Sequence, residues 1–275
     1  MKKILVLLFT CIVIIILGLT TAPNNFPQKK IIAIPTNSST SNIAQILKKE
    51  GAIRSVFLFK VFNFNKPIKA GNYYFDTKEN LFTVLSRLHL GKTNIPYVRI
   101  TIPEGSNNEQ IAAIIWGKLE KFNAPQFVRK AQKYQGFLFP DTYNIPITFD
   151  EDLVIQLLKN TFEKKVGKIS SDMVNMAAIL EEEGNAKDNR KMIADILWRR
   201  LQIKMPLQVD VYMDTYKKRG LPPMPITNPG LESIEAAKEP TPNPYLYYIS
   251  DKGGIFHYAK TYDEHLVNIQ KYLKK

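Results

Sequence analysis

The chain has 275 residues, of which 45% are hydrophobic, and it carries a formal net charge of +13. A hydrophobic fraction of this size is typical of packed domains, so it excludes a wholly disordered chain. The only cysteine is Cys11, which excludes an internal disulfide. The basic residues are dispersed, without zinc-finger spacing or interleaved aromatic residues, and we therefore expect no nucleic-acid partner.

An uncharged apolar segment stands at the N-terminus. Residues 4–21 carry no charge, and a helix of about 20 residues is long enough to cross a bilayer. We predict a single-pass transmembrane anchor over residues 1–22 in the inner (cytoplasmic) membrane. Lys2 and Lys3 place the N-terminus in the cytoplasm and the bulk of the chain outside. A cleavable signal peptide is the alternative, although Pro23 disfavours cleavage after the small residues before it.

A repeated pattern follows. Polar residues 23–30 are interpreted as a tether, so the folded part is expected to begin near residue 31. Residues 31–47 and 99–115 align without a gap, and each has a short apolar strand, a polar turn that offers helix N-caps, and a helix. Between them we predict an aromatic strand ending at residue 75 and a helix over 81–90. This order resembles LysM-type glycan-binding modules, and we predict a LysM-like α+β module with an internal repeat over residues 31–97.

The C-terminal half is predicted to be mostly helical. Apolar residues at helical spacing predict helices over residues 151–168, up to Glu183, and over 188–203. Gly184 is expected to end or bend the second helix. Two β-rich runs around residues 251–254 predict a hairpin, and a last helix is expected over 262–273. The fold class is therefore α+β, with a mostly helical domain over residues 98–275.

Three consecutive carboxylates, Glu181, Glu182 and Glu183, end the central helix. A solvated surface is the simplest interpretation of such a triplet. Residues four and seven apart share a helix face, however, so Glu183 lies on the apolar face with Ile179 and Met176. Burial against apolar side chains raises a carboxyl pKa, and glycosidic-bond cleavage needs an acid that is protonated near neutral pH. Glu183 is therefore either a candidate general acid or a helix end in water.

Other chemistries lack their motifs. The chain has no GxSxG nucleophile motif and no GxxxxGK[ST] phosphate-binding loop. Its three histidines have no partners at zinc-site spacing, so we expect no metal site and no cofactor. Residues 136–146 predict a stiff, aromatic-lined loop in which Asp141 and Tyr143 offer a saccharide platform, with a buried linker as the simpler interpretation.

A series of short motifs runs through nearly the whole chain. It comprises KAGNY at 69–73, IPEG at 102–105, GFLFPDTY at 136–143, EEE at 181–183, RL and MPLQVD between 200 and 210, TY and GLPP between 215 and 223, NPG at 228–230 and TYDEH at 261–265. Each motif is weak alone, but in this order they resemble the YceG-like lytic transglycosylases, the endolytic murein transglycosylase family.

The resemblance implies a membrane-anchored periplasmic lyase that cuts nascent peptidoglycan glycan strands internally and so terminates their elongation. It implies cleavage between N-acetylmuramic acid and N-acetylglucosamine without water, which leaves a 1,6-anhydro end, and it implies peptidoglycan synthases as partners. The family's catalytic glutamate aligns with Glu183, which the helical face also selects. The residues expected to bind substrate are Gln208, Asp210, Thr215, Tyr216, Asn228, Asp141, Tyr143 and His265.

The chain departs from the family pattern near the expected cleft. Val211 and Tyr212 replace the usual Pro-Thr after Asp210, and a long insertion before residues 213–216 is missing. Two alternatives therefore stay open beside the lytic transglycosylase. One is a non-catalytic peptidoglycan-binding or scaffold protein of the elongation machinery, favoured if the short loop has lost the cleft. The other is a muramidase that uses water.

Overall fold

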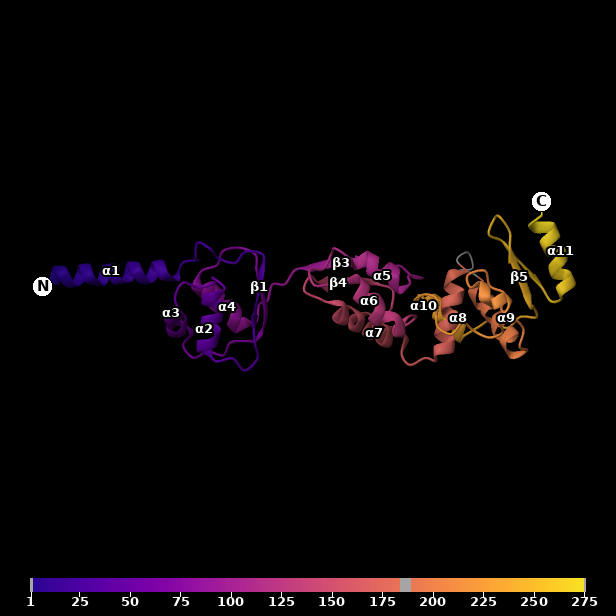
Figure 1. Ribbon diagram of the computed structural model, residues 1–275, viewed down its shortest axis with the longest axis horizontal. Helices are drawn as coiled ribbons and strands as arrows, with labels where there is room; N and C mark the ends of the chain where they lie inside the picture. Colours follow the sequence, from indigo (N-terminus) through magenta and orange to yellow (C-terminus); the bar gives the residue numbers. More distant parts are fainter. Residues whose placement is uncertain (1, 184–188, 275) are drawn as a thin grey trace. The chain divides into compact units, whose positions relative to one another are not determined.

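The computed structural model describes residues 2–183 and 189–274 (Figure 1). The chain divides into two compact units, Met1–Pro96 and Tyr97–Lys275. Both contain helices and two-stranded antiparallel sheets, which confirms the mixed and mostly helical class. Gly184, which was expected to end the Glu183 helix, lies outside the described residues.

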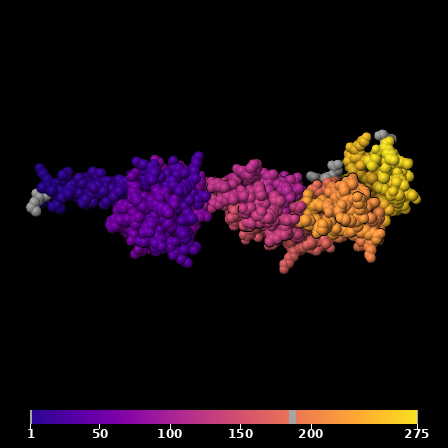
Figure 2. Space-filling view, viewed as in Figure 1, coloured from indigo at the N-terminus to yellow at the C-terminus, as the bar shows by residue number. Residues whose placement is uncertain are grey.

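Within the described residues, α1 (Lys2–Thr20) is the one helix long and apolar enough to cross a membrane. An 18-residue window in it has a mean hydropathy of 2.8, and only 6% of that window is buried. Figure 2 shows α1 standing clear of the rest of the first unit. Length and composition fit either a membrane anchor or a signal sequence.

The rest of the first unit packs three helices against one small sheet. Strand β1 (Lys30–Ile34) pairs antiparallel with β2 (Gly71–Phe75), and its inward side chains join the core. Ser39 accepts a hydrogen bond from the Asn42 N–H and so caps the helix that starts at Thr40, inside the turn where the N-cap was predicted. The helices are α2 (Thr40–Lys49), α3 (Val56–Asn63) and α4 (Leu81–Leu90).

The prediction of a tether over residues 23–30 is wrong for its apolar members. Pro23, Phe26 and Pro27 are buried, and the Phe26 ring meets Phe75 edge-on with 5.5 Å between ring centroids. Ile16 of α1 also packs against this core. The folded unit therefore begins before residue 31, because one aromatic ring and two prolines outweigh the polar residues around them.

The second unit begins with a strand, two helices and an antiparallel strand, the same order that β1, α2, α3 and β2 follow in the first unit. The sequence repeat and the likeness to LysM modules stay predictions. Strand β4 occupies residues that were predicted to be loop, because its partner strand lies about 40 positions earlier in the chain. The elements are β3 (Tyr97–Thr101), α5 (Asn108–Ile115), α6 (Ala124–Ala131), η1 (Gln132–Tyr134), β4 (Thr142–Pro146) and α7 (Glu151–Val166).

Helix α8 (Ser171–Glu182) is the centre of the remaining part of the second unit. Its residues from Val174 to Leu180 are all buried, and α9 and α10 pack against it. The small side chains of Ala177 and Ala178 allow this close approach. The elements that surround it are α9 (Arg190–Gln202), η3 (Met213–Tyr216), α10 (Leu231–Lys238), β5 (Tyr247–Ser250), β6 (Phe256–Ala259) and α11 (Tyr262–Tyr272).

Asn228 joins the two parts of the second unit. Its side chain is completely buried, and its Oδ1 accepts hydrogen bonds from the N–H groups of Gly136 (2.8 Å) and Leu138 (2.9 Å). Its Nδ2 donates to the Ser106 carbonyl at 2.8 Å. The Gly105 N–H donates to its carbonyl at 3.0 Å. One amide thus satisfies backbone groups from two loops that lie about 90 and 120 positions away in the chain.

Replacing this amide is expected to destabilise the second unit. Asn228→Ala leaves the Gly136 and Leu138 N–H groups buried without an acceptor, while the Ser106 carbonyl keeps the Asn228 backbone N–H as its donor, so the loss is about 2 kcal/mol or more. Urea unfolding in detergent, followed by tryptophan fluorescence, measures this unit selectively because Trp116 and Trp198 both belong to it. The exposed Asn160→Ala is the control and should change stability by less than about 0.5 kcal/mol. Equal losses in the two variants would contradict the structural role of Asn228.

Candidate active site

Glu183 directly follows α8, where its backbone N–H donates to the Ile179 carbonyl at 3.1 Å. The residues on its side of the helix, Ile179 and Met176, are fully buried. This burial is the main reason that the pKa of the Glu183 carboxyl rises to about 7, and the nearby negative charge of Asp210 raises it further. The inward orientation expected from helical spacing is therefore present.

A cavity of about 440 Å³ opens in front of Glu183. Its walls come from four parts of the second unit, namely the end of α8, the end of α9, the segment 208–216, and the C-terminal hairpin with α11. The residues that line it are Glu183, Arg200, Gln208, Asp210, Tyr216, Tyr248, Ile249, Ser250, Phe256, Tyr262, His265, Ile269 and Leu273.

Arg200 is the cation of this cavity. Its side chain is 3% exposed, and its guanidinium donates to the backbone carbonyls of Leu246 (2.8 Å) and Leu207. Burial lowers the pKa of Arg200, while its positive charge counteracts the rise in the pKa of Glu183. The guanidinium also lies over the Tyr247 ring, 5.4 Å from its centroid. Arg200 therefore links α9 to Leu207, just before the segment 208–216, and to Leu246, just before the hairpin strand β5.

Sequence reasoning missed Arg200, although a signal was present. Arg200 lies three, four and seven positions after Leu197, Ile196 and Ile193, all of which are fully buried. The spacing that places Glu183 on an apolar helix face thus places Arg200 on one too.

A short loop holds the second carboxylate. The Tyr216 hydroxyl donates to Asp210 Oδ1 at 2.5 Å, and burial raises the pKa of Tyr216 to about 12. Gln208 has a left-handed backbone with a φ of 52°, and its N–H donates to the Thr215 carbonyl at 3.2 Å. A non-glycine residue in this region is strained and is held there by its surroundings. The loop therefore closes and places three polar side chains, those of Gln208, Asp210 and Tyr216, on the cavity.

The hairpin supplies a donor to the acid. The Tyr248 hydroxyl hydrogen-bonds to Glu183, which counteracts the rise in the pKa of Glu183, and burial raises the pKa of Tyr248 well above its usual value. Tyr248 therefore stays a neutral donor. His265 stacks on Tyr247 with 5.1 Å between ring centroids, and burial lowers its pKa. Sequence reasoning placed residues 245–249 in the hairpin but did not select Tyr248.

Of the nine predicted site residues, five meet at the cavity. They are Glu183, Gln208, Asp210, Tyr216 and His265. The structure places the other four elsewhere, and Asn228 is the buried link described above. Thr215 is also buried, and its hydroxyl bonds to the backbone of Val209 and Tyr212.

The predicted saccharide platform does not form at Asp141 and Tyr143. Tyr143 is buried in the core, and its hydroxyl donates to the Phe139 carbonyl at 2.6 Å. Asp141 forms an ion pair with Lys165 at 2.7 Å, which lowers the pKa of Asp141. Strand pairing between β3 and β4 turns the Tyr143 ring inward, so neither residue lines the cavity in front of Glu183.

The other two glutamates of the triplet have different surroundings. Glu181 accepts from the Gly230 N–H at 2.8 Å and pairs with Arg190 at 3.2 Å, while Glu182 is exposed. Glu181 thus ties α8 to the N-terminus of α10, and neither side chain lines the cavity. Among the described residues, no group of three or more His, Cys, Asp or Glu side chains is placed to hold a metal ion.

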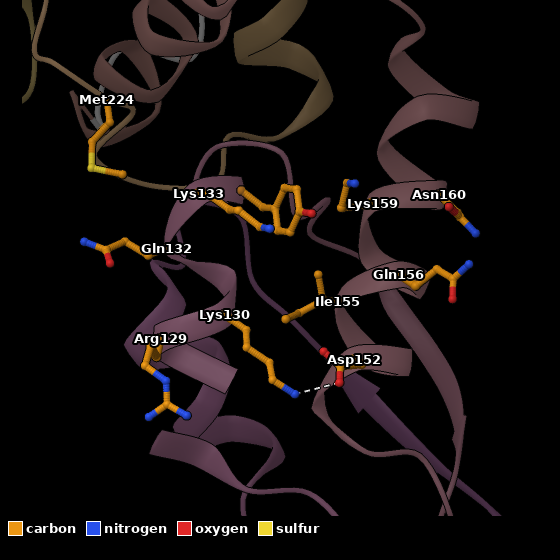
Figure 3. Close-up of a pocket in the computed structure, with 11 residues that line it drawn as sticks. Arg129, Lys130, Gln132, Lys133, Asp152, Ile155, Gln156, Lys159, Asn160 and Met224 are labelled. Atoms are coloured by element: carbon orange, nitrogen blue, oxygen red, sulfur yellow. Dashed lines mark hydrogen bonds and ion pairs between the residues drawn. The ribbon is translucent and has the colours of Figure 1, made fainter. Parts of the chain in front are cut away.

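A larger cavity of about 870 Å³ lies between α6, η1 and α7. Figure 3 shows that most of its labelled side chains are basic or amide, and that its carboxylate, Asp152, is paired with Lys130 at 2.6 Å. Glu183, whose pKa is raised to about 7, lines the smaller cavity and not this one.

Comparisons with known proteins agree with the sequence resemblance. The YceG-like family model matches residues 32–214 and 212–271. The chain belongs to the YceG-like family. The two matched parts meet at residues 212–214. A crystal structure of a yceG-like protein from Listeria monocytogenes is similar, with a TM-score of 0.53 and 27% identity, covering 86% of this chain and 98% of that one.

Named relatives of this YceG-like chain share one activity. An endolytic murein transglycosylase of Bacillus subtilis is 32% identical over 304 residues, which cover 88% of this chain and 84% of that protein. Endolytic murein transglycosylases from two strains of Streptococcus pneumoniae are 26% identical over 88% of this chain and 58% of their own length.

The raised pKa of Glu183 makes stability depend on pH. Because the folded protein holds this proton more tightly than the unfolded chain, the stabilisation is complete below about pH 4.5 and is lost as the pH rises through about 7. Glu183→Gln should therefore match the wild type near pH 4.5 and be more stable at pH 8, by at most about 3 kcal/mol. Thermal unfolding at both pH values measures this difference. Glu163→Gln, at an exposed position, should match the stability of the wild type at both pH values.

Proposed function

We propose that this protein is an endolytic murein transglycosylase that cuts peptidoglycan glycan strands between N-acetylmuramic acid and N-acetylglucosamine. The observation that carries the proposal is the half-buried Glu183, whose pKa of about 7 leaves it protonated in much of the neutral range, at a cavity that a sugar can enter. Family membership and the names of the relatives support the same reaction class.

The first step is proton donation. Protonated Glu183 donates to the bridging oxygen as the bond to the muramic acid C1 breaks, and the N-acetylglucosamine hydroxyl leaves. The developing oxocarbenium charge lies in a cavity that holds the Asp210 carboxylate, which stabilises it by charge. Tyr216 keeps that carboxylate in place through its 2.5 Å hydrogen bond.

The second step returns the proton. The Glu183 carboxylate accepts the proton of the muramic acid C6 hydroxyl while the C6 oxygen attacks C1 and closes a 1,6-anhydro ring. Glu183 ends protonated, as it began, and no water is consumed. Between the two steps the carboxylate is negative, and Arg200 and the Tyr248 hydroxyl stabilise that state.

We also propose where the enzyme acts. Helix α1 serves as a membrane anchor with its N-terminus in the cytoplasm, so that the Glu183 cavity lies outside the cytoplasmic membrane, where nascent strands are made. In this arrangement the first unit acts as a LysM-like module, and the partners are peptidoglycan synthases that release the strands to be cut.

A water-using muramidase is the second candidate, because Asp210 provides a second carboxylate in the same cavity. Glycosidases that consume water usually use a pair of carboxyl groups. A non-catalytic scaffold is less well supported, since the short loop still contributes Gln208, Asp210 and Tyr216 to the cavity.

Product masses separate these candidates. The full chain, incubated with purified glycan strands, should release fragments that end in 1,6-anhydro-muramic acid, and Glu183→Gln should lower the rate by at least about a thousandfold because the acid is lost. Glu182→Gln is the matched control and should retain activity, because Glu182 does not line the cavity. Reducing ends would support the muramidase instead. Intact strands with the wild type, or full activity in Glu183→Gln, would overturn the assignment.

The pH dependence should follow the Glu183 proton. Because the acid must be protonated, kcat/KM is expected to fall about tenfold per pH unit above about pH 7. Asp210→Asn removes a charge that raises the pKa of Glu183, so its falling limb should move to lower pH. Tyr248→Phe removes a hydrogen bond that lowers the pKa of Glu183, so its limb should move to higher pH. Shifts in the same direction would contradict this account of the site.

A further inference from the structure

Four large apolar side chains are exposed together on the first unit. They are Phe57, Val61, Phe64 and Phe82, with exposed fractions of 72%, 44%, 71% and 49%, and we call them the phenylalanine patch. Phe57 and Val61 are four positions apart on one side of α3, and Phe64 directly follows the last residue of this helix.

The patch is continuous with α4. The ring of the half-buried Phe62 lies between two patch members, with centroids 6.4 Å from Phe64 and 5.0 Å from Phe82. Soluble proteins rarely expose several large apolar side chains in one patch unless a membrane or another protein covers that patch.

Phe64 adopts an unfavourable backbone conformation. It ends α3 with a φ of 47° and a ψ of 39°, and Asn65 follows with a φ of 54°. Among the described non-glycine residues with positive φ, Phe64 is the only aromatic one. Such strain in a bulky residue is costly. Because the Phe64 side chain is exposed, its packing within the protein contributes little free energy to offset this strain.

The charges on the α3 side of the patch are of one sign. Residues 51–75 contain Arg54, Lys60, Lys66 and Lys69 and no Asp or Glu. Lys60 lies on α3 itself, and Lys60 and Lys66 are both exposed. Exposed aromatic rings with basic neighbours are the composition of surfaces that bind the interface of anionic membranes.

The patch lies next to the end of α1. Arg54, two residues before α3, donates to the Ala22 carbonyl at 2.9 Å and to Asn24 Oδ1 at 3.2 Å, just beyond the last residue of α1. Ile16 and Thr20 of α1 are packed or buried at the same junction. Along the axis of α1, Figure 1 shows α3 at the edge of the unit where α1 enters and β1 at the opposite edge.

We propose that the phenylalanine patch inserts into the outer interface of the membrane that α1 spans, with its basic neighbours on anionic lipid headgroups. This proposal rests on the anchoring role proposed for α1. The first unit is then seated on the bilayer at two points, the end of α1 and the patch, rather than hanging from a flexible tether. The rings occupy the boundary between headgroups and acyl chains, where aromatic side chains are favoured.

The full chain in vesicles of equimolar phosphatidylcholine and phosphatidylglycerol tests the proposal. An environment-sensitive fluorophore is attached at Val61→Cys in a Cys11→Ser background, and at Asn72→Cys, an exposed position on β2, as the matched control. Spin-labelled lipids with a shallow label should quench the probe at 61 and not at 72. Iodide in the water should quench the probe at 61 about threefold less than the probe at 72.

Two further measurements separate the possible failures. A probe on the native Cys11, which lies within α1, should be quenched by a deep spin label. If it is not, both the anchor and the patch proposal fail. If it is, and the probe at 61 remains open to iodide or is shielded without lipid quenching, the patch proposal alone is overturned.

Variants of the patch complete the test. Phe57→Ser with Phe64→Ser should restore iodide access at position 61. Leu90→Ser should leave the probe protected, because Leu90 is 55% exposed but outside the patch. Equal effects of the two changes would contradict the specific contact.

Discussion

The burial of one carboxyl group between balanced charges is the constraint on which the site depends. Glu183 ends a helix whose other inward residues are apolar, so its ionised form loses solvation and its pKa rises to about 7. Asp210 also raises the pKa of Glu183, whereas Arg200 and Tyr248 lower it. A fully apolar pocket would hold the proton too tightly to release it, and a cationic one would not retain it. The balance suits a group that gives a proton and takes it back.

Polar residues that do not line the cavity hold the backbone of the second unit in place. Asn228 and Thr215 each satisfy backbone groups of neighbouring loops, and Glu181 joins α8 to Gly230 and Arg190. Because an unpaired buried polar group is expensive, each of these side chains restricts its loops to one arrangement. The loops of the second unit are therefore held by residues that resemble site residues in sequence but act on the backbone.

The first unit has the properties of a protein surface that meets a membrane. Ile16 of α1 packs against its core, and the exposed phenylalanine patch begins three residues after Arg54, which hydrogen-bonds just beyond the end of that helix. A unit seated at the bilayer surface would keep an attached enzyme near the place where new strands emerge. The two surfaces, the patch and the Glu183 cavity, belong to different units, and the proposals give them different chemistry, apolar insertion for the patch and proton transfer for the cavity.

The sequence by itself determined the elements whose signals are local. Helical spacing selected Glu183, the same rule identifies Arg200, and the Ser39 cap and the C-terminal hairpin lie where turn residues predict them. Only the tertiary structure decided which polar residues face the cavity. Asn228 and Tyr143 look like site residues in a motif, yet their partners, a pair of distant loops and a paired strand, lie about 40 to 120 positions away. Spacing along one element reports which face a side chain takes, but it carries no information about which distant backbone groups will need that side chain as a partner.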